Sequence, residues 1–103
     1  MNVVTMTGHL VADPARVETG RGVKATFRLA VDSRPRLWID IDTWGHLAGT
    51  CAAHLRKSRA VAVTGRLACD EWTDRDGAHR QRYHVNATAV TFLDAPETGA
   101  AEP

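Results

Sequence analysis

Residues 37–57, LWIDIDTWGHLAGTCAAHLRK, contain the change of pattern that decides the fold. Residues 37–44 alternate an aliphatic residue or threonine with a tryptophan or aspartate, which is typical of a strand with two different faces. If the isoleucines face the core, Trp38 and Trp44 must lie together on the opposite face. Two tryptophans on a non-core face are not ordinary core residues.

From Gly45 the apolar period changes from two residues to that of a helix. The apolar stripe consists of Leu47, Ala48, Cys51, Ala52 and Leu55. Basic residues at the end of this stretch suit the C-terminus of a helix, where cations are favoured. We therefore predict a helix over Gly45–Lys57.

Two strands are expected before residue 37. Residues 2–12 are β-rich and uncharged, and Asp13-Pro14 ends them because proline removes a ladder donor. After a turn with two glycines, Val23–Val31 alternates, so this second strand has one apolar and one basic face.

Two more strands are expected after the helix. The first starts near Val61 and continues to Trp72, and Gly65 within it predicts a bulge or a tight bend. Residues 74–77, DRDG, predict a hairpin turn, and the last strand runs to Phe92.

Five strands with one helix between the third and the fourth predict an all-β OB-fold, a small barrel whose open face often binds oligonucleotides. With 103 residues the chain is expected to form one domain, residues 1–93, followed by a short flexible tail, residues 94–103.

Composition excludes several classes of protein. Hydrophobic residues make up 44% and charged residues 24%, as in a folded domain, and no stretch is apolar for long enough to span a membrane. A cytoplasmic protein is expected. Residues 1–93 contain 13 basic and 9 acidic residues, a formal net charge of +4 that permits an anionic partner.

Cys51 and Cys69 are expected to be buried, reduced thiols.

Trp38, Trp44 and Trp72 are the most informative residues of this short chain. Exposed aromatic rings on a barrel face serve as platforms on which bases stack, and neighbouring cations contact the phosphates. The alternative is that the rings fill the core or a subunit interface. The candidate phosphate-binding residues are Lys24, Arg28, Arg34, Arg36, Arg56, Lys57, Arg66, Arg80 and Arg82.

Several segments together resemble the bacterial single-stranded DNA-binding proteins over about residues 2–93. The matching segments are NVVTMTGHLVADP (2–14), KATFRLAV (24–31), WIDIDTWGHLAGTCAAHLRKS (38–58), VTGRLACDEWTDRDG (63–77) and HRQRYHV (79–85). The resemblance implies sequence-independent binding and protection of single-stranded DNA in replication, recombination, repair or DNA uptake. It also implies a homotetramer, with a dimer as the second choice, in which the first strand pairs between subunits.

In that family three aromatic positions stack on bases, and they correspond to Trp38, Trp44 and Trp72. Arg56, Lys57 and Arg80 correspond to family positions that contact the DNA backbone. We expect these six residues to be the most important for binding.

This sequence also departs from the family pattern. The connection between the second and third strands is short, and acidic residues, Asp70 and Glu71, precede Trp72 where relatives are often basic. Asp40 and Asp42 lie between the other two tryptophans, so weaker or more salt-sensitive binding is expected. The family's acidic tip ending in Pro-Phe is missing from the printed sequence, which puts recruitment of repair and replication enzymes in doubt.

Other functions have less support in the sequence. A zinc site built on Cys51, His54 and His46 lacks converging ligands, and no hydrolase signature is present, so neither a metal, a cofactor nor an enzyme is expected. His9, His79 and His84 are expected to be surface or strand residues. The alternative function is an OB-fold adaptor of the primosome type, whose tryptophans contact a protein partner.

Overall fold

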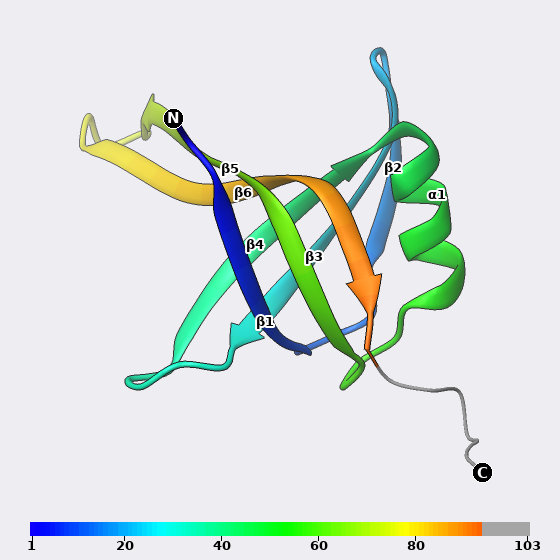
Figure 1. Cartoon of the computed structure of the whole chain (residues 1–103). Coiled ribbons are helices and arrows are strands. Elements are labelled where there is room, and N and C mark those ends of the chain that lie inside the picture. Colours follow the sequence, from blue (N-terminus) through cyan, green and yellow to red (C-terminus); the bar gives the residue numbers. More distant parts are fainter. Residues whose placement is uncertain (94–103) are drawn as a thin grey trace, which may run out of the picture.

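The computed structural model describes residues 1–93, so the expected tail at residues 94–103 lies outside the described part of the chain. Six strands and one helix follow one another along these residues (Figure 1). They are β1 (Val4–Leu10), β2 (Ala15–Thr19), β3 (Gly22–Val31), β4 (Leu37–Trp44), α1 (Gly45–His54), β5 (Ala60–Thr73) and β6 (His79–Phe92).

Five of the strands form a closed ring. The strand order is β1-β5-β6-β4-β3-β2, and a further pairing of β1 with β3 joins the two sides. That joint is short and antiparallel, pairing Gly8–Leu10 with Leu29–Val31. All pairings are antiparallel except that of β4 with β6, which is parallel. The five strands predicted from the sequence are the five strands of this ring.

The remaining strand, β2, was not predicted. All five of its residues are exposed, so its sequence lacks the alternation that marks a half-buried strand. It forms because the turn at Gly20 and Arg21 folds the chain back onto the start of β3, where Ala15 pairs with Thr26 and Thr19 with Gly22. Gly22 has a φ of 110°, a conformation that side chains other than glycine rarely adopt.

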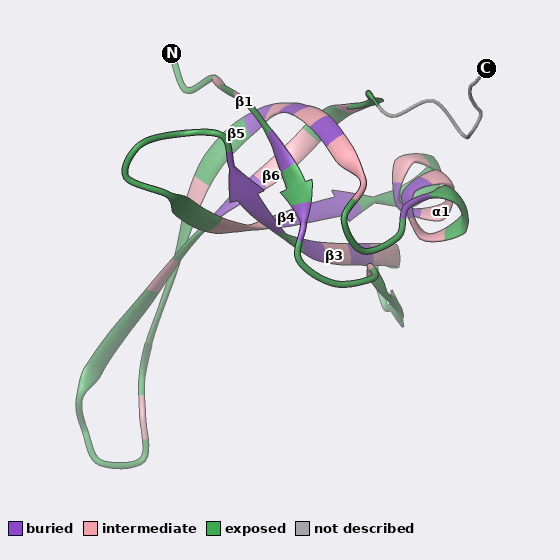
Figure 2. Cartoon of the chain, turned by 90° about the horizontal axis from the view of Figure 1, so that it is seen from below, coloured by how far each residue is buried: buried purple, intermediate pink, exposed green. Residues whose placement is uncertain are grey.

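The core lies inside the ring and beneath α1 (Figure 2). The apolar face predicted for β3 is confirmed, because Ala25, Phe27, Leu29 and Val31 are all buried. The cluster that fills the ring consists of Leu10, Phe27, Leu29, Val31, Ile41, Cys51, Leu55, Val61, Val63 and Val85. Helix α1 contributes its apolar stripe and covers one end of the ring.

Helix α1 ends at His54, three residues before the predicted end at Lys57. Leu55 takes an extended conformation and is buried, while its N–H still donates to the carbonyl of Cys51. The N–H of Lys57 then donates to Asp13 Oδ1 at 2.8 Å. Because a buried leucine and a bond to a distant aspartate compensate for the lost helical bonds, the helix stops early.

The two cysteines differ, contrary to the prediction that both are buried. Cys51 is fully buried in the core, and this burial raises the pKa of its thiol to about 11. Cys69 is exposed, since β5 and β6 extend beyond the ring as a long hairpin whose residues are mostly exposed (Figure 2). Both cysteines are free.

The predicted bulge at Gly65 is confirmed. The register between β5 and β6 shifts between Thr64 and Gly65. A Cβ on Gly65 would collide with the backbone of Asn86 and Ala87, so the two strands approach here more closely than any side chain allows.

We predict that Gly65→Ala lowers the free energy of unfolding by about 1–3 kcal/mol, because backbone atoms must move to admit the methyl group. Gly49→Ala is the matched control, since an added Cβ in α1 meets nothing within 4 Å and should stabilise the helix by up to about 1 kcal/mol. Urea denaturation of both variants measures the two effects. Equal stabilities for the variants would contradict the close approach at Gly65.

Candidate nucleic-acid interface

The three tryptophans lie on one side of the sheet, two of them on the ring and the third on the hairpin that extends from it. Trp38 and Trp44 alternate with inward-facing residues of β4 and are 50% and 37% exposed. Trp72, on β5, is 48% exposed. The core alternative is therefore wrong for all three rings.

Strand register shows that Trp72 shares this face with the tryptophans of β4. Asp42 of β4 is in register with Asn86 of β6, and Asn86 is in register with Arg66 of β5. Every second residue of β5 after Arg66 points the same way, as far as Trp72. We call this surface the tryptophan face; it consists of Lys24, Thr26, Arg28, Trp38, Asp40, Asp42, Trp44, Arg66, Asp70, Trp72, Arg80, Arg82, His84 and Asn86.

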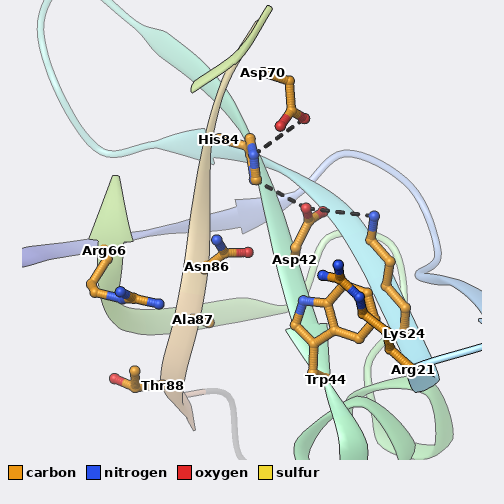
Figure 3. A pocket seen from close by; sticks show the side chains of 10 residues that line it. All are labelled: Arg21, Lys24, Asp42, Trp44, Arg66, Asp70, His84, Asn86, Ala87 and Thr88. Atoms are coloured by element: carbon orange, nitrogen blue, oxygen red, sulfur yellow. Dashed lines mark ion pairs between the residues drawn. The ribbon is translucent and has the colours of Figure 1, made fainter. Parts of the chain in front are cut away.

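A pocket of about 580 Å³ opens at the Trp44 end of this face (Figure 3). Lys24 Nζ lies 5.3 Å from the centroid of the Trp44 ring, a cation–π distance. Arg21 and Arg66 also line the pocket. Arg21 was missed in the sequence because it lies in the β2–β3 turn, and only its position between two turn glycines marks it as a cation at a loop tip.

Carboxylates on the tryptophan face hold most of its cations. Arg28 Nη1 lies 3.6 Å from Asp40 Oδ1, and Arg82 Nη1 donates to Asp40 Oδ2 at 3.1 Å. Lys24 Nζ lies 3.7 Å from Asp42 Oδ2. Among the residues that the structure describes, no ion pair holds Arg66. The face is therefore partly neutralised by its own acids, as the sequence suggested.

His84 was predicted to be a surface or strand residue; it lies in strand β6, and it is buried at the middle of the face. It lies between two carboxylates, those of Asp42 and Asp70. Asp42 is buried too, and it also accepts a hydrogen bond from Thr26 Oγ1 at 3.0 Å. The alternation of the strand predicts which face His84 shares, but only the pairing of β4 with β6 and of β6 with β5 places these carboxylates beside it.

The other predicted cations lie elsewhere or have structural partners. Arg34 and Arg36 lie in the connection between β3 and β4. Arg56 and Lys57 follow α1, and Arg56 Nη1 donates to the carbonyls of Ala52 at 3.3 Å and Leu55 at 2.7 Å. The structure thus gives Arg56 a role in capping the helix.

Arg80 lies opposite Trp72 at the base of the hairpin turn. Its Nε donates to Asp74 Oδ2 at 2.8 Å, and this bond, with the N–H groups of Ala78 and Asp76, holds the pKa of the Asp74 carboxyl below its usual range. Arg80 is therefore well placed to fix the hairpin that carries Trp72.

Tyr83 is a large exposed aromatic residue that the sequence analysis did not single out. It is 53% exposed and lies opposite Cys69, so it points to the other side of the β5–β6 hairpin from Trp72.

Over residues 1–93 no three His, Cys, Asp or Glu side chains are grouped as a metal site requires, and no helix there is long and apolar enough to cross a membrane.

A protein-family model matches residues 1–93, and its description is the single-strand binding protein family. The chain belongs to this family. It is 38% identical to a "Single-stranded DNA-binding protein" of Caldanaerobacter subterraneus subsp. tengcongensis, over 96% of this chain and 71% of the relative. It is 34% identical to "Single-stranded DNA-binding protein 1" of Chlorobaculum tepidum, over 96% and 68%. "Single-stranded DNA-binding protein 2" of a Nostoc species is 30% identical, over 93% and 80%.

Membership of the single-strand binding protein family confirms the predicted OB-fold, with α1 between the third and fourth strands of the ring. It also confirms that the chain is a nucleic-acid-binding protein rather than an enzyme. The tryptophan face is the part of this family member that combines exposed aromatic rings with cations.

We predict that Asp40→Asn in this single-strand binding protein tightens binding to single-stranded DNA two- to fivefold at low salt. The substitution frees Arg28 and weakens one hold on Arg82, and a surface ion pair of this kind is worth up to about 1 kcal/mol. Asp76→Asn makes the same charge change at the hairpin tip and should leave affinity nearly unchanged. Equal effects of the two variants, measured by fluorescence anisotropy, would contradict a competition between Asp40 and phosphate.

Proposed function

We propose that the chain binds single-stranded DNA without base specificity, with bases stacked on Trp38, Trp44 and Trp72 and phosphates contacted by neighbouring Arg and Lys side chains. The observation that carries this proposal is that all three rings are exposed and that strand register puts them on the same side of the sheet. Bound in this way, DNA is protected and not transformed. This activity suits a nucleoid-associated role in replication, recombination, repair or DNA uptake.

Stacking on these rings accounts for binding that ignores sequence. Every base has a π-face, and a base stacked on an aromatic side chain contributes about 1–3 kcal/mol. The tryptophan face offers no continuous row of unpaired polar groups between the rings, since Asp40 and Asp42 are engaged with cations of the face. Contacts with base edges are therefore secondary to stacking.

Cations on both sides of the rings are suited to follow the phosphates. Lys24 and Arg28 of β3 flank the tryptophans of β4, Arg66 lines the pocket beside Trp44, and Arg80 and Arg82 lie toward Trp72. The remaining predicted contacts, Arg34, Arg36, Arg56 and Lys57, extend the track beyond the face. Because most cations of the face are ion-paired, DNA must displace carboxylates as well as counterions.

A homotetramer, or as second choice a dimer, fits the exposed edge of β1. Val4, Thr5 and Met6 pair with β5 on one side, whereas the pairing of β1 with β3 begins only at Gly8. An uncharged strand with an open edge favours pairing with a second copy. Self-association through β1 leaves the tryptophan face free for DNA.

We predict that titration with oligo(dT) quenches tryptophan fluorescence strongly and saturably. Trp44→Ala or Trp72→Ala should each cost about 1–3 kcal/mol of DNA affinity, while light scattering shows the same oligomer as for the unchanged chain. If the oligomer dissociates instead and DNA affinity holds, the tryptophans serve a protein contact, as in the adaptor alternative.

We also predict a salt dependence that single residues alter. Log K should fall with log salt by about 0.7 for each cation that releases a counterion, so Arg66→Ala should reduce the slope by about 0.7. Arg16→Ala is the control. Arg16 is in register with Ala25, so its side chain points to the opposite side of the sheet from the tryptophans, and it pairs with Glu18 at 3.7 Å. A slope near zero for the unchanged chain would overturn the phosphate contacts.

A further inference from the structure

A buried histidine lies at the centre of the tryptophan face between two carboxylates. The side chain of His84 is 7% exposed; its Nδ1 lies 3.0 Å from Asp42 Oδ2 and its Nε2 lies 3.3 Å from Asp70 Oδ2 (Figure 3). Within residues 1–93 neither ring nitrogen finds a hydrogen-bond partner of good geometry. A buried polar group without such a bond is costly to the folded state, which calls for an explanation.

Protonation chemistry supplies that explanation. An ionised carboxylate only accepts hydrogen bonds, and a neutral imidazole has a single N–H to donate. With a carboxylate oxygen at each nitrogen, neutral His84 therefore turns one lone pair toward an acceptor. The imidazolium form has an N–H on both sides and matches both Asp42 and Asp70.

The groups around His84 balance one another in charge. Three carboxylates and three cations face this cluster: Lys24 and Arg28 from β3, Asp40 and Asp42 from β4, Asp70 from β5 and Arg82 from β6. The proton on His84 therefore decides whether this ion-paired cluster is neutral or carries a charge of +1. Arg21 and Arg66, which line the adjoining pocket, have no ion pair within residues 1–93, and their charge does not change with pH near neutrality.

We propose that His84 is a positioning residue that couples DNA binding to the uptake of a proton, by setting the charge of the tryptophan face through Asp42 and Asp70. This inference rests on the proposed function. A phosphate strand laid across the face favours the protonated form, so by reciprocity the protonated form binds the strand more tightly. Protonated His84 also engages Asp42, which otherwise holds Lys24, and weakens the longer contacts of Arg82 with Asp42 and Asp70, so Lys24 becomes available for phosphate while Asp40 still holds Arg82.

The test is the affinity for oligo(dT) at constant salt between about pH 8 and about pH 5, the range in which histidine changes charge. Oligo(dT) is the suitable probe because thymine has no group that titrates in this range. Affinity should rise as the pH falls, by up to about tenfold per pH unit for one proton taken up. Calorimetry in two buffers of different ionisation enthalpy counts that proton directly.

His84→Gln should remove most of this pH dependence. His79→Gln is the matched control, because His79 also pairs with a carboxylate, Glu71 at 2.9 Å, but is exposed and lies on the other side of the hairpin. The control should keep the pH dependence of the unchanged chain. A flat pH profile of the unchanged chain, or an unaltered profile in His84→Gln, would overturn the inference.

Asp70→Asn provides a second variant in case His84→Gln does not fold, since the Asp70 side chain is 59% exposed and can be changed without opening a cavity. It should bind more tightly than the unchanged chain near pH 8 and show a weaker pH dependence. An unchanged profile would count against His84 as the site of the proton. Oligo(dT) binding that is absent at every pH refutes the proposed function itself, whereas binding that ignores pH refutes only the coupling.

Discussion

The position of β4 between β3 and β6 is the constraint on which the interface depends. Because successive side chains of a strand point to opposite faces, burying Ile41 in the ring forces Trp38 and Trp44 outward. The antiparallel partner β3 then sets cations beside them, and the parallel partner β6 sets His84 and Arg82 beside the aspartates of β4. A shift of one residue in the register of β4 with β3 or with β6 would turn the tryptophans toward the core and separate them from the other residues of the tryptophan face.

The tryptophan face carries carboxylates as well as cations. A surface that binds phosphates gains from unpaired cations, yet Asp40 and Asp42 engage Arg28, Arg82 and Lys24. These pairs orient the cations, and in the proposed binding mode they must be rearranged when DNA binds, since one guanidinium cannot satisfy a carboxylate and a phosphate equally well. Arg66 is free of this competition within residues 1–93. The stacking rings therefore carry more of the proposed affinity than the net charge of the domain suggests.

Local features account for what the sequence predicted and what it missed. The ring strands, the bulge at Gly65 and the outward tryptophans follow from period-2 alternation and from one glycine without room for a side chain. Strand β2 was missed because its exposed residues have no periodic signal. The early end of α1 was missed because it depends on a bond between Lys57 and the distant Asp13. Both cysteines look alike in sequence, and only the projection of the β5–β6 hairpin beyond the ring leaves Cys69 exposed.

The sequence by itself determined the OB-fold, its family and the residue types that we propose to contact DNA, because alternation and motif spacing are local properties of the chain. Tertiary structure alone decided which of the predicted cations lie with the tryptophans, since Arg66 and Arg82 reach them through strand pairing whereas Arg56 caps a helix. It also decided the place of His84 between Asp42 and Asp70. Those three residues come from three different strands, and their distances are set by the closure of the ring and not by any spacing along the chain.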